Sequence, residues 1–416
     1  MSDSLSEARP PAYETSPARE TSLFDDLEYR MQFAPVCRLE DGALAGAELQ
    51  LLGPAGTSVG TAAALRRAAR MMEQQGSIDR RKRDFAGSDT ARSIAKVLPL
   101  LVSVDLDLVD DIDQAVVDSL EQHVTVVLPE MLERSPQNVL GRVNKARAAG
   151  RVICVDGLAS SRQAATLLSL VEPDIIMTSA ELLRREPDSD AAQLAHIIAA
   201  HTERTHAVVI ADGVDTEQQR RTAQTLGAAF GIGRLYPPVA DPSRLATKAI
   251  VPLPDLPVWS TPQSGFDTPF AIASQSTTPR RGTKRLLIEM SKELERQATN
   301  GGAGVVLGTF QHAHNFTSTT ATRWREMSEI TGLAGVYGVG LVDVRDGNVH
   351  RAPLSPDDDL VNEWNVVVLG PHFAGLLSAR DQHSGAADLE RTFDFVLTYD
   401  RLAVTQAVHS ILSRFC

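Results

Sequence analysis

Acidic residues within or just after apolar segments are the side chains of this sequence best suited to chemistry. They are Glu48, Asp105, Glu130, Asp156 and Asp212. Converging carboxylates can hold a divalent cation, because hard cations take oxygen ligands and a metal-bound water can attack a phosphodiester. Acidic residues are also common where a strand gives way to a loop. From the residues alone, a metal site and ordinary loop acids both stay open.

The segment 151–179 shows how such residues would be positioned. An apolar run stops at Asp156, a helical pattern follows, and a second apolar run covers residues 175–177. This pattern predicts a β-α-β unit. Parallel strands joined by a crossover helix place their carboxyl ends on one edge, so Asp156 and residues 177–179 are expected at the same cleft.

The same alternation extends over a much longer stretch. Residues 31–52 predict a strand, a turn at residues 40–42 and a second strand. Strand and helix patterns then alternate to about residue 250, which predicts a TIM-type barrel with the acidic residues at its strand ends. Residues 1–22 are rich in Ser, Glu, Pro and Ala and predict a disordered tail.

A second, smaller α/β domain is expected after the barrel. Residues 251–282 are rich in Pro, Ser, Thr and Gly and read as a linker and lead-in. An amphipathic helix over residues 284–297 opens a domain at 283–416, in which strands and helices alternate again. A helix is predicted from His372, between the strands WNVVVLG and FDFVLTYD.

Composition excludes several classes of protein. The formal net charge of −12 argues against direct nucleic-acid binding through phosphates. The one dense basic run, residues 80–83, is interpreted as a solvated helix face. Three widely separated cysteines favour a reducing, cytoplasmic location, and no segment reaches the roughly 20 apolar residues that a membrane helix needs. No secretion signal is recognised at the N-terminus.

Residues 23–250 resemble the EAL-domain family, bacterial barrels that hydrolyse cyclic di-GMP with two divalent metals. The resemblance rests on motifs in the family's order: GAELQLLG, SVDLD, VVLPE, VDGLASS, DIIMTS, ADGVDTEQQ and GIGRLYPP. It implies that Glu48 and Asp156 keep the family's residues and that Asp105 and Asp212 are acidic replacements. These four, with Glu130, would form a vestigial site.

The same resemblance implies lost chemistry. The positions expected to have lost catalytic or substrate-binding side chains are Leu52, Val127, Gly157, Met177, Ser179 and Ile232. Valine and glycine side chains cannot coordinate a metal, and methionine cannot replace an ammonium group. The barrel is therefore expected to be catalytically inactive, with no catalytic residue, no bound metal and no cofactor.

The C-terminal domain resembles the DICT domain, a sensory module found with diguanylate cyclases and two-component proteins. KRLLIEMSKELE, VVLGTFQHAHNFT, EWNVVVLGPHFAGLLSARD and RTFDFVLTYDRL carry this resemblance. Aromatic and charged residues at strand ends predict a small-ligand pocket, with a structural role as the alternative. The pocket residues are Gln311, His312, His314, Glu363, Trp364, His372 and Arg380.

Together these patterns predict a non-enzymatic signalling protein in which a sensor is coupled to a degenerate barrel. The barrel would serve as a platform for a protein partner, such as a regulator or signalling enzyme, or for dimerisation. The alternative is a receptor that binds cyclic di-GMP or another small ligand without cleaving it.

Overall fold

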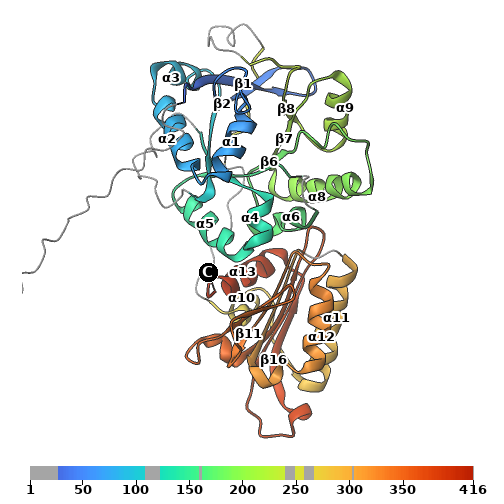
Figure 1. Cartoon of the computed structure of the whole chain (residues 1–416). Helices are drawn as coiled ribbons and strands as arrows, with labels where there is room; N and C mark the ends of the chain where they lie inside the picture. Colours follow the sequence, from blue (N-terminus) through green and yellow to red (C-terminus); the bar gives the residue numbers. More distant parts are fainter. Residues whose placement is uncertain are drawn as a thin grey trace, which may run out of the picture.

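The computed structural model describes residues 27–107, 122–158, 162–238, 249–256, 267–301 and 304–415. They form an N-terminal barrel and a C-terminal α/β domain beside it (Figure 1). The expected tail at 1–22 and the helix expected after Asp107 lie outside the described residues. No described helix is long and apolar enough to span a membrane.

A closed barrel of eight strands forms the first domain, as expected. Its strands are β1 (Arg30–Arg38), β2 (Leu44–Leu52), β3 (Leu100–Asp105), β4 (Gln122–Val127), β5 (Val152–Asp156), β6 (Ile175–Thr178), β7 (Val208–Asp212) and β8 (Phe230–Ile232). Strands β2 to β8 pair in parallel, but β1 is antiparallel to both β2 and β8. The short turn after β1 explains this direction, because a parallel pairing needs a crossover of a dozen or more residues.

Strand alternation separates two apolar layers. Leu101, Val124, Cys154, Ile175 and Ile210 belong to the cluster inside the barrel. Their neighbours in sequence face outward, into the layer beneath the surrounding helices. Those helices are α1 (Ala62–Met71), α2 (Gln75–Ala86), α3 (Asp89–Ala95), α4 (Pro129–Arg134), α5 (Pro136–Ala148), α6 (Arg162–Thr166), α7 (Leu168–Val171), α8 (Ser189–Thr205) and α9 (Glu217–Thr225).

The second domain is a mixed sheet with helices on both faces. The strand order is β12 (Val344–Asp346), β13 (Val349–Pro353), β11 (Leu333–Val339), β10 (Val305–His312), β14 (Glu363–Leu369), β15 (Ala374–Asp381), β16 (Thr392–Thr398) and β9 (Arg280–Thr283). Its helices are α10 (Pro269–Ser274), α11 (Lys284–Gly301), α12 (Ser318–Ser328) and α13 (Arg401–Leu412), with short 3-10 turns at Ala313–Asn315, Asp359–Asn362 and Asp388–Glu390. Helices α11 and α12 cover one face of the sheet (Figure 1).

Two sequence-based expectations for this domain are wrong. The segment expected to form a helix from His372 is strand β15, which pairs with both β14 and β16. Its Ala and Leu residues suit a helix, but pairing on both sides decides the outcome. The supposed linker at 251–282 also contains structure. Helix α10 packs on α13, and β9 pairs with β16, so the domain starts before residue 283.

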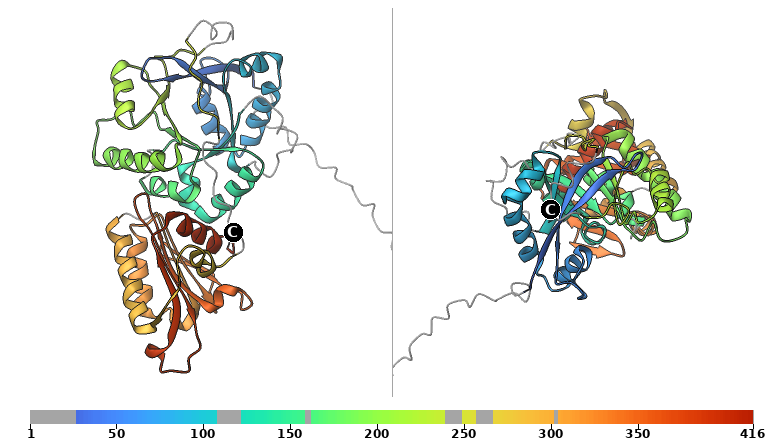
Figure 2. Two further views of the ribbon diagram at one scale, coloured as in Figure 1. Left: turned by 180° about the vertical axis from the view of Figure 1, so that it is seen from behind. Right: turned by 90° about the horizontal axis from the view of Figure 1, so that it is seen from above.

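The two domains share one continuous apolar core. Leu167 and Val171 of the barrel belong to the same buried cluster as Val367, Val404 and Val408 of the second domain. Helix α13 lies between the barrel and the sheet in both side views (Figures 1 and 2). The second domain is therefore packed against the barrel rather than merely tethered to it.

Candidate functional site

Four of the five predicted acidic residues gather at the carboxyl end of the barrel. Glu48 lies in β2, and Asp105, Asp156 and Asp212 are the last residues of β3, β5 and β7. The alternation of side chains points all four into the barrel mouth, since the residues two positions earlier on β3, β5 and β7 line the interior or the cavity.

A small cavity lies beneath these carboxylates. Its volume is about 10 Å³, roughly the room needed for one water molecule. Its walls are mostly apolar side chains of the strands, with Glu48, Ser103, Asp156 and the guanidinium of Arg66 among them. The interior of the barrel is thus packed, and the polar groups of the site lie at its mouth.

Two arginines of α1 reach into this mouth. Arg66 Nη1 lies 3.1 Å from Asp156 Oδ2, and Arg70 Nε lies 3.2 Å from Asp105 Oδ2. The helix begins at Thr61, whose side chain accepts a hydrogen bond from Ala64 N. Residues four apart share a helix face, so this start places both guanidinium groups over the carboxylates.

A third cation is buried beside Glu48. Lys82 of α2 forms a salt bridge with Asp79 at 3.1 Å and donates to the carbonyl oxygen of Ser103. Ser103 Oγ lies 3.4 Å from Glu48 Oε1. Asp79 Oδ2 also accepts from the backbone N–H of Asp105, which fixes the end of β3.

The interpretation of residues 80–83 as a solvated face is therefore wrong in part. Arg80 is exposed, but Lys82 is only 3% exposed, and Arg81 stacks on the ring of Tyr29. The sequence analysis missed Arg66, Arg70, Asp79 and Lys82 as members of the site. The spacing of Arg66 and Arg70 places them on the same face of a helix. This spacing does not show whether that face points into the barrel or toward solvent.

The carboxylates do not all have a cationic partner. The pKa of Asp212 is raised from 3.8 to about 6, first by burial and then by the negative charges of Asp156 and Glu48. Arg66 opposes this shift without cancelling it. Burial also raises the pKa of Asp105, against the lowering effect of Arg70. The mouth therefore holds more negative charge than its arginines neutralise.

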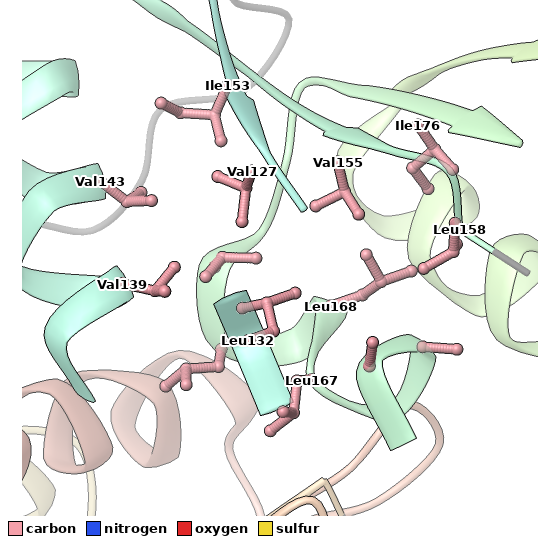
Figure 3. Close-up of a cluster of buried hydrophobic side chains, with 14 of the residues drawn as sticks. Val127, Leu132, Val139, Val143, Ile153, Val155, Leu158, Leu167, Leu168 and Ile176 are labelled. Atoms are coloured by element: carbon pink, nitrogen blue, oxygen red, sulfur yellow. The ribbon is translucent and has the colours of Figure 1, made fainter. Parts of the chain in front are cut away.

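Two predicted site residues lie elsewhere. Val127 faces outward and packs with Val139, Val143 and Ile153 beneath α5 (Figure 3). It does not face the barrel interior; Val124 and Val126 are the β4 residues that line the cavity. Glu130 is exposed in the first turn of α4. The VVLPE segment thus supplies no carboxylate to the mouth.

The segment 151–179 forms one compact corner of the mouth. Gly157 has φ +83°, a conformation that favours glycine, and a Cβ there would meet nothing within 4 Å. The N–H groups of Gly157 and Leu158 donate to Met177 O at 2.9 and 3.1 Å. Met177 lines the cavity, as predicted for a residue of this strand, while Ser179 Oγ accepts from Glu181 N.

The remaining predicted positions contribute apolar surface. Ile232, at the end of β8, is buried in the cluster inside the barrel. Leu52, at the end of β2, is half-buried and does not line the cavity beneath the mouth.

A divalent metal does not fit these residues well. Guanidinium groups already pair with Asp105 and Asp156, and the β4 wall of the cavity is formed by the apolar side chains of Val124 and Val126. Within the described residues, no group of three His, Cys, Asp or Glu side chains is arranged to hold a metal ion. Two of the four carboxylates at this mouth, Asp105 and Asp156, are paired with cations of the chain itself.

In the ligand pocket predicted for the second domain, Glu363 and Arg380 form an internal pair. Glu363 is fully buried and accepts from Thr268 Oγ1, from Phe270 N at 3.1 Å and from Arg380 at 3.0 Å. Arg380 also lies over the ring of Phe270, 4.5 Å from its centroid. These contacts hold the start of α10 against the sheet, so the Glu363–Arg380 pair has a structural role.

Trp364 and His372 lie apart from this pair, whereas Gln311, His312 and His314 lie at or just after the end of β10, at the end of the sheet where β14 begins. Trp364 packs with Phe393 in the core beneath α11 and α12, on the other face from Glu363. His312 and His314 stack on each other after β10, next to Gln311. His372 follows β14, at the opposite end of that strand from Glu363. Adjacency in sequence misled the prediction, because a strand carries its two ends far apart.

Comparisons with known proteins agree with the two-domain organisation. The family profile of the EAL domain matches residues 20–238, just over half of the chain. The profile described as "Sensory domain in DIguanylate Cyclases and Two-component system", DICT, matches residues 270–382. No curated protein sequence matches the chain.

Several solved structures are similar to the barrel. Klebsiella pneumoniae BlrP1 in a calcium and cyclic di-GMP complex is 17% identical, with a TM-score of 0.41, over 50% of this chain and 54% of that one. The chain thus spans about half of BlrP1. The Xanthomonas citri FimX EAL domain with cyclic di-GMP is 14% identical, with a TM-score of 0.38, over 51% and 88%. An EAL domain protein from Listeria monocytogenes is 11% identical, with a TM-score of 0.40, over 53% and 91%.

The closed barrel of eight strands lies within the residues that the EAL profile matches. The chain belongs to the EAL-domain family and carries a C-terminal DICT domain.

Proposed function

We propose that this chain is a non-catalytic regulatory protein of cyclic di-GMP signalling, in which the DICT domain senses a signal and the barrel acts as a protein-binding or dimerisation platform. The carrying observation is the pairing of Arg66 with Asp156 and of Arg70 with Asp105. A two-metal hydrolase needs these carboxylates for cations that polarise water and phosphate. Here the guanidinium groups of Arg66 and Arg70 pair with these carboxylates instead.

The chemistry of a guanidinium supports this proposal. An arginine neutralises a carboxylate, but it carries no water that could lose a proton and attack phosphorus. The described mouth also offers neither a lysine at position 177 nor a carboxylate from β4. Lys82 lies close by, but its ammonium group is committed to Asp79 and Ser103.

Incubating the whole chain with cyclic di-GMP and Mg²⁺ or Mn²⁺ tests the proposal. Turnover is measured by chromatography of the products. We expect the wild type to show no more turnover than an Asp156→Asn variant. Metal-dependent turnover that disappears in the variant would overturn the proposal.

Titration calorimetry with the same nucleotide separates the platform from a receptor. If the barrel is only a protein-binding or dimerisation platform, titration with cyclic di-GMP should give no saturable binding heat. Saturable binding without turnover would instead assign the chain to the receptors, which remain the alternative. A pull-down with the whole chain would then identify the protein partner.

A further inference from the structure

The contact between the two domains contains several buried or half-buried basic groups. Arg401 of α13 donates through Nη2 to Ser169 Oγ at 2.9 Å, across the domain boundary. His409 of the same helix contacts Leu170 O through Nε2 at 3.0 Å. Ser169 and Leu170 belong to α7 of the barrel, so one short helix receives both contacts. We call this contact the interdomain joint.

On the barrel side, one network supports the joint. Glu172, directly after α7, is 2% exposed, and its Oε1 accepts from Arg204 of α8 at 3.4 Å. Arg147 of α5 donates to the carbonyl oxygen of Glu172. Three guanidinium groups, those of Arg147, Arg204 and Arg401, thus surround one carboxylate.

His201 connects this network to the backbone, and its contacts fix its protonation state. Its Nε2 lies 3.0 Å from Pro173 O, which can only accept, so Nε2 must carry the hydrogen. Its Nδ1 lies 3.3 Å from Arg204 Nη2, which can only donate, so Nδ1 must be bare. The ring is therefore neutral. A proton on Nδ1 would remove the hydrogen bond and place two cations in contact.

The surroundings make protonation costly for both buried histidines. Burial, aided by Arg204, Arg401 and Arg147, lowers the pKa of His201 to about 4. Burial, aided by Arg147, lowers that of His409 to about 4.

A second pair of histidines lies near the joint. His196 on α8 and His372 after β14 are exposed and lie on opposite sides of the domain boundary. They are close enough for His196 to contribute to the lowered pKa of His372. The nearby acidic groups are Glu172 and Asp174. Asp174 Oδ2 accepts from Ile153 N and lies near Arg147.

We infer that the interdomain joint is an acid-sensitive latch, which holds the DICT domain on the barrel while His201 and His409 are neutral and releases it when they are protonated. The sign follows from linkage. The ring of His409 lies in the contact itself, and Arg401 across the boundary contributes to the lowered pKa of His201, so the released form binds more protons. The closed state is therefore fully stable above a pH of about 6.5 and is progressively lost toward about 4.

Small-angle X-ray scattering of the whole chain between pH 7.5 and 4.5 tests this inference, with far-UV circular dichroism of the same samples. We expect the radius of gyration to rise on acidification while the circular dichroism persists. Glutamine can donate to Pro173 O and Leu170 O in place of each histidine Nε2 but does not titrate. The His201→Gln, His409→Gln variant should therefore show no rise in the radius of gyration between pH 7.5 and 4.5. His312→Gln, at an exposed histidine far from the joint, is the matched control and should not shift the midpoint.

Two outcomes overturn the inference: a constant radius of gyration across this range, or a rise that coincides with loss of circular dichroism. An equal midpoint in the double glutamine variant and the His312→Gln control would also overturn it. If the double variant does not fold at pH 7.5, nuclear magnetic resonance of the wild-type histidines decides. Two of the ten histidines should stay neutral at pH 6 and take up protons where the radius of gyration rises. Uptake by every histidine above the pH of the rise contradicts the latch.

Discussion

Replacing Asp212 by asparagine should stabilise the protein at neutral pH. The pKa of this carboxyl is raised from 3.8 to about 6 by burial and by Asp156 and Glu48. The folded state therefore holds the proton more tightly than the unfolded state, and stability falls as the pH rises from 3.8 to about 6. The shift of about two units corresponds to about 3 kcal/mol above pH 6. Because the side chain keeps some exposure, we expect Asp212→Asn to gain about 1–3 kcal/mol at pH 7.5.

Urea unfolding of both proteins at pH 7.5 and pH 4 measures this effect. The gain should be present at pH 7.5 and nearly absent at pH 4, where Asp212 is protonated in the folded wild type. Asp215→Asn is a control of opposite sign, because hydrogen bonds and the charge of Arg234 lower the pKa of Asp215. That variant should lose stability at pH 7.5.

Two results would refute the reasoning on Asp212. One is a variant that is less stable than the wild type at pH 7.5, which would mean that the carboxylate has a partner. The other is the same difference at both pH values, which would mean that charge is not the cause. Adding Mg²⁺ at pH 7.5 should stabilise neither protein, whereas a bound cation would stabilise the wild type alone.

Two further substitutions test the arginine pairing and the close contact between the domains. Arg66→Ala should cost about 2–4 kcal/mol at pH 7.5, because it leaves the partly buried carboxylate of Asp156 unpaired. Urea unfolding measures this cost against that of Arg67→Ala, the exposed neighbour on α1, and equal effects of the two substitutions would contradict the pairing. Gly304→Ala should cost about 1–3 kcal/mol, because its Cβ would lie 2.1 Å from the backbone oxygen of Thr166; Gly87→Ala, with its nearest contact at 3.5 Å, should be close to neutral in the same thermal unfolding assay.

Much of the fold was predictable because strand burial follows apolar runs. The runs before Asp105, Asp156 and Asp212 became barrel strands, and the acidic residues after them reached the mouth. Whether neighbouring strands run parallel or antiparallel can be predicted from the lengths of the connections between them. The strand β15 could not be recognised, because its Ala and Leu residues suit a helix until β14 and β16 pair with it.

The site was predictable only as far as strand ends define it. Carboxylates at strand ends converge by topology, whereas the arginines of α1 reach the mouth through the packing of a helix that the sequence does not orient. Val127 shows the smallest such error, since a shift of one residue along a strand moves a side chain from the barrel interior to its outer layer. Lys82 shows the opposite error, because a basic run suggested solvent where α2 buries one of its cations.

The apolar cluster that includes Leu167, Val404 and Val367 also limits how the protein can be divided into separate domains. A truncation between the two profile matches would leave this cluster half uncovered on each product, and an isolated barrel would present α7 to solvent. We expect such fragments, which expose this surface permanently, to self-associate more readily than the intact chain. Deletion phenotypes in this protein would then include the effects of self-association, whereas point substitutions at the mouth or at the joint would report signalling.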